Sequence, residues 1–190
     1  MVDDIASPGH EVPNGVPSLD PTLFEWSVRF SEIGTQWRTA EPYQSVSGEF
    51  FLTPLSQAVH TDPPNFNPSL YSEKEQRIGR ELRIIDDSPF TGAGVFVAIR
   101  LQSNVHSPEM WISDHTQGLW KMDLDYSAYV KFLRLTKGAF GWQHLFTQAP
   151  LDDYEFQRTA DRIARMLNTL PQVFPDYDYT TLLERGGERL

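Results

Sequence analysis

The chain has 190 residues, of which 39% are apolar and 13% aromatic, so it is long enough to fold around a sizeable core and is not disordered as a whole. It contains no cysteine, which excludes disulfides, zinc–thiolate sites and cysteine nucleophiles. The net charge is −10, and residues 1–75 alone hold 11 acids and 3 bases. Such a field repels nucleic acid and attracts basic partners, or it serves solubility alone.

The N-terminal residues and the lengths of the apolar runs predict the cellular location of the protein. The chain begins Met1-Val2-Asp3-Asp4, which lacks the cationic start of a secretory signal. No apolar run approaches the roughly 20 residues that a membrane span requires. We therefore expect a cytoplasmic protein with no membrane partner.

The first part of the chain gives two readings. Residues 1–20 are rich in proline and glycine, which predicts a flexible arm before one domain at residues 21–190. Asp20 and Pro21 form a good helix start, and apolar residues recur after them at helical spacing. The same region also alternates between apolar and polar residues, as strands do. Residues 21–37 are therefore left as helix or strand.

The middle of the chain predicts consecutive antiparallel strands. Apolar and polar residues alternate strictly after the glycine turn at residues 91–94, and a five-residue turn containing Gly118 separates two further strand-like runs. A proline-rich loop and a short polar helix are expected at residues 61–69 and 69–80. The expected strands are residues 46–52, 81–85, 95–101, 109–113 and 119–123.

Helices are predicted mainly after the strands. Asp125 is a good N-cap, and the helix that follows has an apolar stripe and basic residues in its last turn. The predicted helices cover residues 125–137, 152–170 and 179–185. Gly138 is expected to end the first, Pro171 the second and Gly186-Gly187 the third. The pattern as a whole is typical of an α+β fold, in which helices pack on one face of an antiparallel sheet of four to six strands.

Motifs for catalysis and cofactor binding are absent from the sequence. No nucleophile elbow, P-loop or dinucleotide fingerprint occurs, and no two of the five histidines have a metal-ligand spacing, so we expect no metal and no cofactor. The nearest pair to a catalytic site is Asp114-His115, although aspartate is also a common turn former. Adjacent acids elsewhere fit a helix cap, at Asp152-Asp153, or a turn, at Asp86-Asp87.

Two groups of aromatic residues admit either a core role or a surface role. Trp111 and Trp120 stand on the paired strands of the predicted hairpin, so they belong to the core or form an exposed interaction patch. Trp142, Leu145 and Phe146 follow the helix at residues 125–137. We interpret these three as a plug that closes the core below that helix.

A resemblance to a known family covers part of the chain. The run Met110-Trp111-Ile112-Ser113-Asp114 is followed by Gly118-Leu119-Trp120-Lys121-Met122, by a helix at residues 124–129 and by a Gly- and Trp-containing tail at residues 137–146. These features resemble the C-terminal half of the SUKH superfamily, which includes fungal cell-wall assembly regulators and bacterial immunity proteins. The resemblance implies an α+β fold, no shared catalytic residues, and neutralisation of a cognate toxin by binding.

The expected function is therefore binding of another protein without catalysis, as a bacterial immunity protein whose partner is a basic toxin domain such as a nuclease. An acidic surface competes for a phosphate-binding site and speeds encounter. The alternatives are a small hydrolase or transferase that uses Asp114 and His115, and a structural or regulatory scaffold subunit. We expect a monomer or weak homodimer. The candidate contacts are Glu41, Glu49, Asp62, Glu73, Glu75, Trp111, Asp114, His115 and Trp120.

Overall fold

The computed structural model describes residues 19–26 and 33–190. The predicted arm, apart from its last two residues, lies outside the described part of the chain. The ambiguous segment at residues 21–37 contains one element of each kind. A 3₁₀ helix, η1, covers Pro21–Trp26, and a strand, β1, covers Ile33–Arg38. Asp20 accepts a hydrogen bond from the Thr22 amide at 2.9 Å, so the predicted helix start is confirmed.

The centre of the fold is a six-stranded antiparallel sheet in which each strand pairs with the next one in sequence. All five predicted strands are present, with ends that differ by at most one residue, and β1 adds a sixth at one edge. This confirms the predicted α+β class. The strands after β1 are β2 (Ser47–Leu52), β3 (Leu82–Asp86), β4 (Val95–Arg100), β5 (Glu109–Asp114) and β6 (Gly118–Met122).

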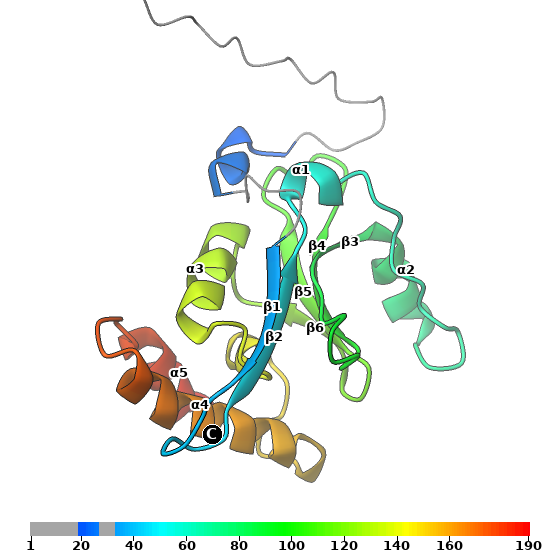
Figure 1. The fold of residues 1–190 in the computed structure, drawn as a ribbon. Helices are drawn as coiled ribbons and strands as arrows, with labels where there is room; N and C mark the ends of the chain where they lie inside the picture. Colours follow the sequence, from blue (N-terminus) through cyan, green and yellow to red (C-terminus); the bar gives the residue numbers. More distant parts are fainter. Residues whose placement is uncertain (1–18, 27–32) are drawn as a thin grey trace, which may run out of the picture.

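The helices lie on both faces of this sheet, but unequally (Figure 1). The longer ones cover the inner face, where the main core forms, whereas α2 lies on the opposite, outer face over a small cluster of buried residues. Thus α2 is the exception to the predicted one-sided arrangement. The helical segments are α1 (Leu55–Ala58), α2 (Glu73–Glu81), α3 (Tyr126–Thr136), η2 (Trp142–Phe146), η3 (Tyr154–Phe156), α4 (Gln157–Val173) and α5 (Thr180–Arg189).

The turn that follows α3 is attached to the edge of β2. Gly138 has a φ of 71°, which allows the chain to leave the helix in the left-handed region. Its carbonyl accepts a hydrogen bond from the Glu49 amide at 3.0 Å, and the Phe140 amide donates to the Ser47 carbonyl at 3.1 Å. A side chain at Gly48 would come within 2.6 Å of the Gly138 oxygen. The close approach of these two segments therefore requires glycine.

The predicted plug is confirmed. Trp142 and Leu145 are fully buried, and Phe146 is 2% exposed. Trp142 packs against Tyr129 of α3, with ring centroids 5.3 Å apart, so η2 does close the core below that helix.

Two predicted helix ends are wrong. Pro171 lies inside α4, which continues to Val173. A proline this close to the end removes one amide hydrogen, and the Phe174 amide still donates to the Leu170 carbonyl at 2.8 Å. Likewise α5 runs through Gly186 and Gly187 instead of stopping there. The reason is packing, because a Cβ at Gly186 would overlap the Cδ1 methyl of Leu167 on α4.

This contact predicts opposite effects for two adjacent substitutions. Gly187→Ala meets no atom within 4 Å and should raise the free energy of unfolding by about 0.5 kcal/mol through helix propensity. Gly186→Ala should lower it by about 1 kcal/mol, because the added methyl overpacks against Leu167. Urea denaturation of the two variants measures the difference. Equal effects would show that α5 does not pack closely on α4.

Candidate protein-binding face

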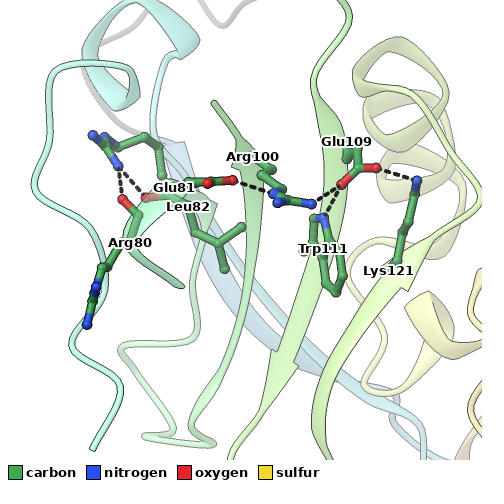
Figure 2. Close-up of polar contacts among 8 residues, drawn as sticks. Arg80, Glu81, Leu82, Arg100, Glu109, Trp111 and Lys121 are labelled. Carbon is green, nitrogen blue, oxygen red and sulfur yellow. Dashed lines mark hydrogen bonds and ion pairs between the residues drawn. The ribbon is translucent and has the colours of Figure 1, made fainter. Parts of the chain in front are cut away.

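The outer face of the sheet carries a row of alternating charges (Figure 2). Glu81 at the end of α2, Arg100 on β4, Glu109 on β5 and Lys121 on β6 make up this row, which we call the charged row. The Arg100 Nε donates to Glu81 at 2.6 Å and its Nη1 donates to Glu109 at 3.1 Å. The Lys121 Nζ donates to the other oxygen of Glu109 at 2.5 Å. The row therefore crosses the sheet without leaving a carboxylate unpaired.

Trp111 stands inside the charged row and is fixed by it. The indole Nε1 donates to Glu109 at 3.0 Å, and the Arg100 guanidinium lies 6.0 Å from the centroid of the ring. Register places Trp111 opposite Ala98 on one side and Lys121 on the other. The side chain is half-buried, so part of its surface faces outward. Its contacts with Glu109 and Arg100, together with the neighbouring strands on both sides, fix its orientation.

The pKa values of the charged row follow from its pairing. Burial alone would raise the pKa of Glu109, but hydrogen bonds from Lys121, Trp111 and Arg100 outweigh it and hold this pKa below its ordinary value. Burial alone would lower the pKa of Arg100, but the bonds to Glu81 and Glu109 raise it. Both residues are therefore charged at neutral pH.

An apolar floor adjoins the charged row under α2. The Phe66 ring packs edge-on against Tyr71 and Phe96, with centroids 4.4 and 6.2 Å apart. Gly79 of α2 lies directly over it, because a Cβ there would come within 2.5 Å of the Phe66 ring. Trp111 and Leu119 pack against the same cluster and remain only partly buried. The outer face thus joins an aromatic floor to a set of fixed charges.

The predicted acidic contacts do not form one surface. Glu73 and Glu75 begin α2, and the Glu75 carboxylate lies next to Gly118 at the start of β6, so these two acids border the outer face. Asp62 is exposed in the loop that precedes α2. Glu41 is also exposed, but it belongs to the β1–β2 turn, which lies beside α4 and away from α2 (Figure 1).

The prediction for Glu49 is wrong, because this residue is 4% exposed. Its carboxylate accepts hydrogen bonds from the Phe90 amide at 2.5 Å, from the Thr91 amide at 3.0 Å and from the Thr91 hydroxyl. These bonds satisfy the backbone of the loop between β3 and β4. Glu49 is therefore a structural residue and is not accessible to a partner.

The two hairpin tryptophans lie on opposite faces of the sheet, so neither reading of them as a pair is correct. The turn pairs Asp114 with Gly118, which puts Trp111 opposite Lys121 and Trp120 opposite Ile112. Trp120 therefore packs against the main core on the inner face, edge-on to Phe156 with centroids 5.8 Å apart. Only Trp111 contributes to the outer face.

Asp114 and His115 serve the turn. The Asp114 carboxylate accepts from the Thr116 amide at 2.8 Å and from the Thr116 hydroxyl at 2.7 Å, which is an Asx turn. His115 is exposed, and no hydrogen bond joins it to Asp114 in the described part of the chain. The structure does not bring the two side chains together as an acid–base pair, and the alternative enzymatic function remains a prediction.

A buried carboxylate that sequence reasoning assigned to a turn lies in the core instead. Asp86 is 4% exposed, accepts a hydrogen bond from the Tyr129 hydroxyl at 2.5 Å and accepts another from the Phe51 amide at 2.8 Å. Burial raises its pKa from 3.8 to about 7, against the smaller lowering by these hydrogen bonds. A bulge between Ile84 and Asp86 turns the side chain inward, and the sequence carries no clear signal for such a bulge.

Among residues 19–26 and 33–190, no group of three or more histidines and acids is arranged to hold a metal ion. None of the helices in this part of the chain is both long and apolar enough to cross a membrane.

No protein-family model matches the chain, and comparisons with curated proteins and with solved structures gave no significant match. By its fold and by this face, the chain is an α+β domain whose outer sheet face is preformed. The resemblance to the SUKH superfamily stays a prediction.

Proposed function

We propose that this chain binds another protein through the outer face around Trp111, and that it acts by binding alone, as an immunity protein of the SUKH type that neutralises a basic toxin domain. One observation carries the proposal. Trp111 is an aromatic side chain at the surface whose orientation is already fixed by Glu109 and Arg100.

Fixed aromatic side chains suit the centre of a protein interface. Trp and Arg are enriched among the residues that dominate binding energy, and they act in patches from which water is excluded. A side chain that is ordered before binding loses less conformational entropy when the partner arrives. The charged row holds Trp111 in this way, and the partly buried side chains of Tyr71, Phe96 and Leu119 supply apolar surface beside it.

Charge supports a basic partner. The two acids that begin α2, Glu73 and Glu75, border the outer face, and neither forms an ion pair with another described residue. The acids of the charged row already have cationic partners and add little net field. The long-range attraction therefore comes from the net charge of −10, and the fit at short range comes from Trp111 and its surroundings.

Capture from a lysate of the source cell at low and at high salt tests the binding. We expect the wild-type chain to retain a basic protein at low salt and less of it at high salt, because screening weakens electrostatic steering. Trp111→Ala should lower retention at least about tenfold, as expected for a central aromatic anchor. Tyr154→Ala is the matched control, because Tyr154 is 89% exposed on η3, outside the outer face, and its loss should leave retention unchanged.

Neutralisation is tested separately with the captured protein. Its expression alone should arrest growth of a host cell, and co-expression of the wild-type chain should restore growth. The Trp111→Ala variant should restore growth less well at equal expression. A captured protein without toxicity would contradict the immunity role while leaving the binding face intact. Equal retention by wild type and Trp111→Ala would contradict the binding face itself.

A further inference from the structure

A small cavity lies on the other side of the molecule, where the β1–β2 turn meets α4. Its volume is about 110 Å³, which is more than a single water molecule needs. Figure 1 shows the β1–β2 turn beside α4 at the end of the sheet far from α2. The cavity is lined by Ser45, Val46, Ser47, Phe140, Arg162 and Arg165.

The polar groups around this cavity have few partners. Arg162 and Arg165 are exposed residues of α4, and neither forms an ion pair with any described residue. Arg165 uses only its Nε, which donates to the Asp161 carbonyl at 3.2 Å. The hydroxyls of Ser45 and Ser47 make no hydrogen bond within residues 33–190. Two guanidinium groups and two hydroxyls therefore retain unused donors beside one cavity.

The walls of the cavity are held in place by the fold. Phe140 is hydrogen-bonded through its amide to the Ser47 carbonyl at 3.1 Å, as part of the junction between β2 and the turn after α3. The Phe140 ring lies 5.9 Å from the Arg162 guanidinium, a cation–π contact that positions the charge without consuming an N–H donor. The opposite wall is α4, which fixes the spacing of the two arginines.

Electrostatics at the cavity favour an anion. Burial is the main cause that lowers the pKa of Arg162, and the charge of Arg158 is the next. Asp114 opposes this lowering more strongly than Arg165 adds to it. These three arginines stand at positions i, i+4 and i+7 of α4, so they share one side of the helix. A bound anion would relieve their mutual repulsion and would accept hydrogen bonds that the chain leaves unmade.

We propose that this cavity binds one phosphate-class oxyanion, either free inorganic phosphate or the phosphoryl group of a phosphomonoester. The tetrahedral anion accepts N–H donors from Arg162 and Arg165 and O–H donors from Ser45 and Ser47. Arginine suits this ligand because its planar guanidinium pairs with phosphate oxygens in a bidentate manner. The site is independent of the outer face and of the proposed protein partner.

Calorimetric titration of the full chain tests the site, with inorganic phosphate and phenyl phosphate as probes at constant ionic strength. We expect saturable binding of one anion per chain. Arg162→Gln and Arg165→Gln should each weaken it at least about tenfold. Arg77→Gln is the matched control, because it removes one exposed arginine from α2 on the opposite face and should leave binding unchanged.

The two probes distinguish the possible sources of the ligand. Tighter binding of phenyl phosphate than of phosphate would assign the site to phosphomonoesters, with the phenyl group against Phe140. The reverse order would assign it to free phosphate. Absence of saturation with both probes, or equal weakening by Arg77→Gln and Arg162→Gln, would overturn the proposal. Circular dichroism of each variant confirms that it is folded, so a loss of binding reports on the site.

Discussion

Trp142→Ala should lower the free energy of unfolding by about 3–5 kcal/mol, which is the usual range for truncation of a fully buried large aromatic side chain. Trp142 has no exposed surface and packs against Tyr129 and Phe146, at centroid distances of 5.3 and 6.1 Å. The helix η2 and the helix α3 meet at this ring. A cavity left there would be lined by residues of both helical segments, and their limited ability to collapse into it raises the cost.

Chemical denaturation with fluorescence and circular dichroism measures this loss. Tyr154→Ala provides the reference for an exposed aromatic side chain and should change stability by less than about 0.5 kcal/mol. A loss below about 1 kcal/mol for Trp142→Ala would contradict the role of η2 as the plug of the core. The same variant should retain the outer face, because Trp111 lies on the other side of the sheet.

Asp86→Asn should remove one large contribution to the pH dependence of stability. The pKa of Asp86 is raised from 3.8 to about 7 in the folded chain, mainly by burial. The folded chain thus holds this proton more tightly than the unfolded chain does. The stability that Asp86 contributes is fully present below its pKa in the unfolded chain, and it is lost as the pH rises through about 7. Between about pH 5 and about pH 8 the loss amounts to roughly 2–3 kcal/mol.

His144 changes the folding stability with pH in the opposite direction. Burial lowers its pKa from 6.5 to about 4, so the folded chain prefers the neutral imidazole. The stability that it contributes is complete above the unfolded pKa and is lost as the pH falls toward about 4. Between about pH 5 and about pH 8 this adds roughly 2 kcal/mol as the pH rises. The two buried groups therefore nearly cancel in the wild-type chain.

The cancellation makes the Asp86→Asn variant informative. Asparagine keeps an oxygen that accepts the Phe51 amide but does not ionise. The stability of the variant relative to wild type should increase by roughly 2–3 kcal/mol from about pH 5 to about pH 8. Urea denaturation of both chains at several pH values measures this difference. A difference that stays constant with pH would show that Asp86 is ionised throughout the range and is not held protonated by burial.

Local signals in the sequence were sufficient for most of the fold. The alternation of Val95 to Leu101 and the glycine turn before β6 identified the central hairpins, and Asp125 and Gly138 marked the two ends of α3. Helix ends failed where tertiary packing outweighed local preference. Gly186 looks like a stop signal, yet it is the residue that lets α5 approach Leu167.

The candidate site was less accessible to sequence reasoning, because it depends on which face of the sheet each residue occupies. Parity along β5 separated Trp111 from Ile112, but only the register of the hairpin shows that Trp120 faces inward. The acids were chosen for their charge, so buried Glu49 was included. The charged row was missed, because Glu81, Arg100 and Lys121 are distant in sequence and meet only through strand pairing.

The affinity of the purified partner for three chains tests the central claim most directly. Calorimetric titration of the captured protein into wild type, Trp111→Ala and Tyr154→Ala gives three dissociation constants under one buffer condition. We predict that Trp111→Ala binds at least about tenfold more weakly than wild type, with Tyr154→Ala unchanged. Equal affinities for wild type and Trp111→Ala, with both chains folded, would show that the outer face is not the binding surface.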